Sequence, residues 1–192
     1  MTDSEAHRTL GEDPDLGPLV AEHGELTLAP AEDTFHRLVV SIVNQQLSSE
    51  SAASIRDRLE RRFDITPATM LGADEAALRE TGLSGQKVEY VRNVARAYRE
   101  REYPAALADL DDGAVVEELT DITGVGTWTA KMYLLFCLGR ADVFPVEDLG
   151  VRRGMESLFG ADTTRREMET IAERWRPYRS YATLHLWRHY EG

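Results

Sequence analysis

The chain has 192 residues, 42% of them hydrophobic and 29% charged, which indicates a folded protein large enough for one compact body or two small lobes. Its 34 acidic and 22 basic residues give a net charge of −12. No apolar run approaches the roughly 18 residues of a membrane helix, and the acidic N-terminus is unlike a signal peptide, so we expect a cytoplasmic protein with no membrane partner. The single cysteine, Cys137, excludes an intramolecular disulfide and any metal or iron–sulfur site built from several cysteines.

The first half of the chain shows helical periodicity. Residues 1–30 contain one short apolar patch that predicts a small docked helix: Leu16, Leu19 and Val20. From Asp33, apolar residues recur at the i, i+3, i+4, i+7, i+8 spacing of a helix: Phe35, Leu38, Val39, Ile42 and Val43. Residues 44–50 interrupt this pattern, and Ser49 is expected to cap a second helix that extends to Phe63. A short helix at 73–80, a turn of small residues at 81–85 and a helix at 86–101 are expected to follow.

The second half of the chain continues the helical pattern. Asp111 or Asp112 is expected to cap the next helix, and the apolar run at 128–138 predicts another. Further helices are expected at 149–159, from the capping box Thr164-x-x-Glu167 to Pro177, and from there towards the C-terminus. Strand-like alternation is nearly absent and no internal repeat is visible, so the sequence predicts an all-α fold.

The turn Gly124-Val125-Gly126 lies between two of these helices. Glycines permit positive φ angles and the close approach of another backbone. The N–H groups that begin the following helix face this turn, and together with the helix dipole they form a site for an anion. If the anion is a DNA phosphate, the turn binds the backbone without reading the base sequence. Taken alone the turn is a weak signal, because many helical hairpins have one without any function.

The residues around this turn carry a more specific pattern. Leu-x-x-x-x-Gly-Val-Gly-x-Trp-Thr-Ala at 119–130, followed by Asp-Val-Phe-Pro-x-x-Asp at 142–148, resembles the helix-hairpin-helix superfamily of DNA glycosylases, and within it the 3-methyladenine (alkylbase) DNA glycosylases. Residues 42–48 and 175–187 resemble the first helices and the C-terminal helix of that family. The resemblance implies two helical lobes with a cleft between them: a barrel lobe at 34–140 that ends in the hairpin, and a discontinuous lobe from 1–33 and 143–192.

The resemblance implies a monofunctional DNA glycosylase that hydrolyses the N-glycosidic bond of alkylated purines of the 3-methyladenine type in base excision repair. Such an enzyme would flip the damaged base out of double-stranded DNA, work as a monomer near the nucleoid, and need no cofactor. Two alternatives stay open: a glycosylase for another lesion, such as hypoxanthine or a mismatched base, and a non-catalytic helix-hairpin-helix DNA-binding module.

Asp148 corresponds to the catalytic carboxylate of the family. Alkylation places positive charge on a purine and makes it a good leaving group, so no strong general acid is needed. An ionised carboxylate beneath C1′ can stabilise the charge that develops on the deoxyribose, and can orient or deprotonate the attacking water. Glu147 would take this place after a one-residue shift, but the motif puts the catalytic acid second. The structural alternative is that Asp148 only caps the helix that begins at Leu149.

Three aromatic residues are candidates for the base pocket. Trp128 and Trp187 fall where the family lines its pocket, and Tyr133 is a weaker candidate. An indole face would stabilise a desolvated cationic alkylpurine by about 1–2 kcal/mol, although a tryptophan in an apolar helix is more often a core residue. Leu149 and Met132 stand where some relatives have aromatic residues, so the pocket is expected to be less aromatic and to accept a different range of substrates.

The expected DNA contacts come from the hairpin, from Gln46 and from Lys131. The hairpin residues are Gly124, Val125, Gly126 and Thr127. Gly85 lies where a relative carries a bulky wedge that fills the gap left by the flipped base. Because a glycine cannot do this, Gln46 is the best replacement, with an ordinary polar helix end as the alternative. Members that also cut the strand carry a lysine where this chain has Trp128, so Lys131 is expected to contact the backbone and the enzyme to be monofunctional.

No metal site is expected in this chain. His185 and His189 stand at i and i+4, but no third ligand is spaced to complete a site, so packing or surface histidines are the better interpretation. The hairpin carbonyls could hold a monovalent cation, as in relatives.

The charge balance is unusual for a protein that binds DNA. A basic patch is the usual footprint of such a protein, yet this chain is acidic, and Lys87 and Lys131 are its only lysines. An acid-rich, lysine-poor composition indicates either that nucleic acid is not bound or that the protein works in very high salt, where charges are screened to within about 3 Å at 1 M. We expect a salt-loving prokaryotic source. A high-GC coding bias would replace lysine by arginine, but it would not explain the excess of acid.

Overall fold

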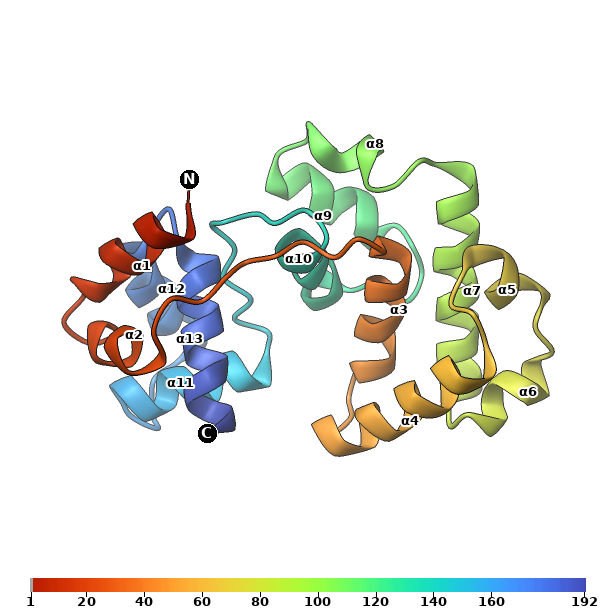
Figure 1. The fold of residues 1–192 in the computed structure, drawn as a ribbon, viewed down its shortest axis with the longest axis horizontal. Coiled ribbons are helices and arrows are strands. Elements are labelled where there is room, and N and C mark those ends of the chain that lie inside the picture. Colours follow the sequence, from red (N-terminus) through yellow and green to blue (C-terminus); the bar gives the residue numbers. More distant parts are fainter. Residues whose placement is uncertain (1) are drawn as a thin grey trace. The chain divides into compact units, whose positions relative to one another are not determined.

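The computed structural model describes residues 2–192, and all regular secondary structure in that range is helical (Figure 1), so the all-α prediction is confirmed. The chain divides into two compact units. One combines the N-terminal segment up to Pro30 with Gly139–Gly192, and the other is Ala31–Leu138. Within residues 2–192, none of the helices has both the length and the apolarity to cross a membrane.

The unit Ala31–Leu138 is organised around two helices, α3 (Thr34–Asn44) and α7 (Gly85–Glu100). α3 packs against α7, α4 (Ser49–Arg62) and α10 (Thr127–Phe136). The apolar face that the sequence predicts for α3 is buried: Phe35, Leu38, Val39, Ile42 and Val43. The remaining helices of this unit are α5 (Pro67–Gly72), α6 (Glu75–Glu80), α8 (Ala105–Ala108) and α9 (Asp112–Thr120).

The second unit is organised around α13 (Arg179–Glu191). This helix contacts α1 (Asp3–Gly11), α2 (Gly17–His23), α11 (Leu149–Phe159) and the short 3₁₀ helix η1 (Glu173–Trp175). α12 (Arg165–Ala172) leads from α11 into η1. The apolar patch predicted near Leu16 forms part of this core, because Leu16, Leu19 and Val20 are all buried.

The helix starts for which the sequence offers a cap residue follow that signal, with one shift. Asp111 caps α9, and the capping box of Thr164 and Glu167 opens α12, as expected. The cap of α4 is Ser48 and not Ser49: its hydroxyl oxygen accepts from the Ser51 N–H at 3.3 Å. α12 ends at Ala172, before Pro177, because the chain tightens there into η1.

The apolar periodicity does not predict α1 or α5, which are short helices with few buried residues. Both nevertheless begin with a threonine cap. Thr2 and Glu5 form a capping box, and Thr66 caps a helix whose first residue is Pro67. These cap signals are readable in the sequence, and they mark the starts that periodicity misses.

Candidate nucleic-acid and catalytic site

The two glycines of the hairpin between α9 and α10 serve different purposes. Gly124 has a φ of 106°, a conformation that side-chain-bearing residues rarely adopt, and a Cβ there would overlap the Tyr90 ring. Gly126 has an ordinary φ of −93°, is exposed, and would place a Cβ in open space. Gly124 is therefore required by the fold, whereas Gly126 leaves room for a group outside the protein.

The N-terminus of α10 has no side-chain cap, because Gly126 occupies the N-cap position. The N–H groups of a first helical turn lack acceptors within the helix, and the dipole adds partial positive charge there. Thr127 is exposed at this end, and Val125 is 4% exposed and anchors the turn in the core. Any contact that Val125 makes with a ligand would have to come from its backbone.

Two side-chain amides bond the backbone of the hairpin and the residue Thr129 beside it. The Gln45 amide Nε2 donates to the Gly124 carbonyl oxygen and to the Thr129 hydroxyl, each at 3.0 Å. Asn93 Nδ2 donates to the Thr123 carbonyl at 3.0 Å. Sequence reasoning missed Gln45 and Asn93, because no local pattern marks a partner so far along the chain. Among residues 2–192, no group of three or more His, Cys, Asp or Glu side chains is placed to hold a metal ion.

Gln46 lies at the apex of the turn between α3 and α4. Its φ of 58° makes it the one non-glycine residue with a positive φ in the described part of the chain, and its side chain is exposed. Leu47 beside it is 39% exposed. Gly85 is the first residue of α7 and carries no side chain that could reach a duplex. The exposed tip of this region is therefore the pair Gln46 and Leu47.

The predicted residues of α10 differ in their surroundings. Trp128 and Lys131 are half-buried in the first turns of the helix. Tyr133 is only 1% exposed, its hydroxyl bonds that of Tyr98 at 3.0 Å, and burial raises its pKa to about 12. Its ring thus packs in the core of the unit Ala31–Leu138, which leaves no face of it open to a ligand.

Asp148 caps α11 and also bonds a tryptophan. Its Oδ1 accepts from the Val151 N–H at 3.0 Å and from the Trp187 indole Nε1–H at 2.7 Å. The Asp148 side chain is half-buried. Glu147, the residue before it, is not the N-cap of α11. Asp148 can cap α11 and also act as a catalytic carboxylate, because the capping bond fixes the direction of its carboxylate group. Trp187 reaches Asp148 through its N–H edge, a contact that the sequence does not predict.

Two glycines of α11 allow this contact. A Cβ on Gly150 would come 2.8 Å from Cδ1 of Trp187, and one on Gly154 would come 2.8 Å from the Leu186 carbonyl oxygen. α11 and α13 can therefore approach closely enough for the indole to reach the carboxylate. Gly150 and Gly154 stand at i and i+4, so the sequence contains a signal for the close packing of α11 against another helix.

α13 and α11 also hold the loop that leads to Asp148. The Arg179 Nε donates to Asp142 Oδ1 at 2.7 Å, and the Ser180 hydroxyl donates to the Arg140 carbonyl at 2.5 Å. Nearer the site, the Arg152 guanidinium donates to the Glu147 carbonyl at 2.5 Å. The backbone before Asp148 is thus bonded at both ends, and the carboxylate is presented from a fixed loop.

The two histidines considered as a metal pair have separate partners. His185 is 1% exposed, and its Nδ1 lies 3.2 Å from Nδ1 of His23, while burial lowers its pKa to about 4. His189 Nε2 lies 3.0 Å from the Ser157 hydroxyl. These contacts agree with packing histidines.

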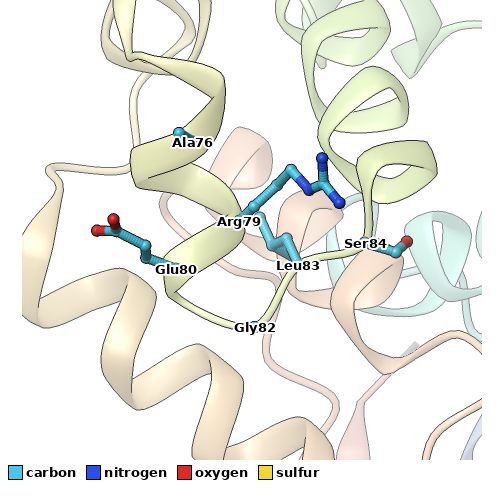
Figure 2. A pocket seen from close by; sticks show the side chains of 6 residues that line it. All are labelled: Ala76, Arg79, Glu80, Gly82, Leu83 and Ser84. Carbon is cyan, nitrogen blue, oxygen red and sulfur yellow. The ribbon is translucent and has the colours of Figure 1, made fainter.

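A second hairpin, between α6 and α7, borders a hollow of about 550 Å³ (Figure 2). Figure 2 shows Gly82 at the bend, with Leu83 and Ser84 leading into α7. Gly82 has a φ of 105°, Leu83 is buried, and Ser84 caps α7 by accepting from the Lys87 N–H at 3.1 Å. This hairpin resembles the first one in backbone and in sequence, since Thr-Gly-Leu-Ser at 81–84 corresponds to Thr-Gly-Val-Gly at 123–126.

Comparison with known proteins gives a consistent result. The family described as HhH-GPD superfamily base excision DNA repair protein matches residues 39–179. A putative DNA-3-methyladenine glycosylase of Bacillus subtilis is 28% identical over 188 residues, which is 92% of this chain and 66% of that protein. The chain therefore spans about two thirds of the length of that relative.

Two solved structures resemble the whole chain. The 3-methyladenine DNA glycosylase of Schizosaccharomyces pombe, in complex with abasic DNA, matches with a TM-score of 0.89 and 26% identity, over 98% of this chain and 97% of the other. A DNA-3-methyladenine glycosidase of Bacillus halodurans matches with a TM-score of 0.78 and 33% identity, over 95% of this chain and 87% of the other.

Proposed function

The chain belongs to the HhH-GPD superfamily of base excision DNA repair proteins, and on this premise we propose that it is a DNA glycosylase that removes alkylated purines of the 3-methyladenine type. The observation that carries the proposal is the position of Asp148. The carboxylate stands where the family motif has its catalytic acid, and it is bonded by the α11 backbone and by the Trp187 indole. Its partner is double-stranded DNA that contains the damaged base, and the enzyme acts in the cytoplasm at the nucleoid.

The chemistry needs one oriented carboxylate. The alkylated purine already carries positive charge, so it leaves without strong acid assistance. As the glycosidic bond breaks, cationic charge develops on the deoxyribose, and the Asp148 carboxylate stabilises it and directs water to C1′. Two N–H donors fix the direction of Oδ1 before the substrate arrives, so the carboxylate does not have to turn during the reaction.

Recognition combines backbone binding with stacking. The amide N–H groups at the start of α10 bind a phosphate beside Gly126, and Lys131 adds charge to the same helix. Gln46 at the exposed tip enters the duplex and fills the gap left by the flipped base. Trp128 and Trp187 are, each by itself, candidates for an indole face that stacks on the cationic purine.

Asp148→Asn tests the catalytic assignment, because it removes the charge and keeps the shape. We expect release of methylated bases from alkylated DNA to fall by about 100-fold or more, while the affinity for DNA is retained. Glu147→Gln is the matched control, and its release rate should stay near that of the wild type. An active Asp148→Asn beside an inactive Glu147→Gln would mean that the catalytic residue is one position earlier.

The same assay separates the two alternatives. A non-catalytic DNA-binding module would release no base, and a glycosylase for hypoxanthine or mismatched bases would leave methylated bases in place. Borohydride added during turnover should trap no covalent adduct, because the lysine position of the strand-cutting members is Trp128. An adduct through Lys131 would contradict monofunctional hydrolysis.

We also propose that the acidic composition suits the enzyme to high salt. With a net charge of −12, self-repulsion and repulsion from DNA are greatest in dilute buffer. Excision and thermal stability should therefore both rise from dilute buffer towards molar KCl. Excision that is greatest at about 0.1 M KCl and falls steadily above it, as counterion release predicts, would contradict the proposal.

A further inference from the structure

Two basic side chains bond the turn that carries Gln46. The Lys87 ammonium donates to the Val43 carbonyl at 2.6 Å and to the Gln45 carbonyl at 2.8 Å. Arg56 donates to the Asn44 side-chain oxygen at 2.6 Å. The two Lys87 bonds cap the C-terminal end of α3, where carbonyl oxygens lack helical partners and the dipole favours a cation.

Gln45 joins this turn to the hairpin. Its backbone carbonyl is bonded by Lys87, and its side-chain amide is bonded to the Gly124 carbonyl and the Thr129 hydroxyl. Gly124 lies in the hairpin turn, and Thr129 lies in the first turn of α10. One residue therefore connects the end of α3 to the element proposed to bind a phosphate.

The next residue, Gln46, has a left-handed backbone that costs about 1 kcal/mol or more for a side-chain-bearing residue. Such a conformation persists when its surroundings impose it. The residues before Gln46 are fixed by the bonds just described, whereas Gln46 and Leu47 are exposed. The geometry is that of a rigid base with a projecting tip.

Lys87 itself is turned inwards. Both acceptors of its ammonium group are backbone carbonyls, and desolvation lowers its pKa. One of the two lysines of this chain is therefore used inside the protein rather than offered to DNA. An uncharged donor could not balance the carbonyl end of α3 as well, because a cation there also gains from the helix dipole.

We propose that Gln45, supported by Lys87, is a positioning residue that couples the hairpin to the tip Gln46–Leu47, so that a phosphate bound at the hairpin sets how Gln46 enters the duplex. This inference rests on the proposed function. Gln45 acts through Gln46 and the hairpin, and it does not contact the reacting atoms.

The test uses one lesion in two DNA substrates. In a duplex the damaged base must be flipped out of the helix, whereas in a single strand it need not be. Single-turnover release of 7-methylguanine is measured in a duplex opposite cytosine and in single-stranded DNA. Gln45→Ala should slow release from the duplex by about ten-fold and from the single strand by less than about two-fold, because only the duplex requires the tip. Lys87→Met should give the same pattern, and Lys87→Arg, which keeps the charge and the donors, should restore most of the rate.

Gln86→Ala is the matched control, because it removes a glutamine amide that donates to the Tyr90 hydroxyl instead of to the hairpin backbone.

A double variant tests the coupling. If Gln45 acts through Gln46, Gln45→Ala/Gln46→Ala should be no slower on the duplex than the slower single variant. Multiplying losses, or equal losses on duplex and single strand, would overturn the proposal. Wild-type release from the duplex tests the proposed function by itself: its absence would refute the glycosylase assignment, whereas its presence with unaffected variants would refute only the coupling.

Discussion

Two hairpins in the unit Ala31–Leu138 share a backbone design and differ at one cap. In each, a glycine with a φ near 105° is followed by a buried aliphatic residue and then by the N-cap of a helix: Gly82, Leu83 and Ser84 before α7, and Gly124, Val125 and Gly126 before α10. Ser84 caps its helix with its own hydroxyl, whereas Gly126 has no side chain with which to do so.

We propose that this difference separates a structural hairpin, which ends in Ser84, from a hairpin that binds DNA, which ends in Gly126. A serine at the N-cap satisfies one amide of the first helical turn and stabilises the helix. A glycine supplies no acceptor for the amide N–H groups of that turn, so an acceptor outside the protein can bind them. The space where a Cβ would stand is open at Gly126. The same bend can therefore join two helices or present a phosphate site, depending on whether the N-cap residue supplies its own oxygen.

The largest expected effect concerns the shared glycine. Gly124→Ala should lower the free energy of unfolding by about 2–5 kcal/mol, because it combines a positive φ with overlap against the Tyr90 ring. Gly82→Ala should cost less, about 1–2 kcal/mol, because its added Cβ would meet the end of the Arg58 side chain and, at 2.9 Å, Cγ1 of Ile55, which are aliphatic or flexible groups and not an aromatic ring. Urea unfolding of both variants measures the difference. Equal losses would mean that Tyr90 moves aside at little cost.

Gly126→Ser makes the binding hairpin resemble the structural one. We expect the affinity for abasic duplex DNA to fall about ten-fold, or about 1.4 kcal/mol, because the added hydroxyl competes for the amides of α10. Stability should change little, since nothing lies within 4 Å of the added Cβ. Gly126→Ala, which adds only the methyl group, should weaken binding less. Unchanged affinity in both folded variants would contradict a phosphate site at this turn.

Ser84→Ala makes the reverse change. Loss of the cap on α7 should lower the free energy of unfolding by about 1 kcal/mol, and so the melting temperature by roughly 2–4 °C. The affinity for DNA should stay within about two-fold, because a structural hairpin needs no phosphate. A drop in affinity as large as that of Gly126→Ser would show that both hairpins bind DNA.

The smallest expected effect is in the salt dependence. The slope of log affinity against log salt reflects the phosphates neutralised by Lys and Arg. Gly126→Ser changes a contact made by backbone amides, so it should lower affinity at every salt concentration without changing the slope. Titrations of abasic DNA at several KCl concentrations measure this, and a slope lower by about 1 would point to a cationic side chain at the hairpin.

The helices could be predicted because their signals are local. The periodicity of α3, the cap Asp111 and the capping box of Thr164 each depend on residues within two turns of one another. The errors are local as well. Ser48 and Ser49 are adjacent and chemically alike, so a sequence pattern cannot choose between them, whereas the extended backbone at Ser48 does.

The site was only partly predictable. The sequence pattern predicted Asp148 and the hairpin as candidates. It could not indicate that the Tyr133 ring is buried against Tyr98, because the same apolar helix pattern would fit a residue on either face. Nor does the sequence pattern single out Gln45, because no regular spacing in the sequence predicts which residue a side-chain amide in a turn will bond.

The amino-acid sequence alone determined the helical fold class, the caps and the order of the motifs, because each arises from contacts between residues a few positions apart. The tertiary structure decided that Trp187 bonds Asp148 across 39 residues and that Gln45 bonds Gly124 across 79. These partners meet only after the helices have packed, and the close approach at Gly150 and Gly154, or the bend at Gly124, sets which side chains come within hydrogen-bonding distance. A hydrogen bond depends on position to within a few tenths of an ångström, and packing fixes that position.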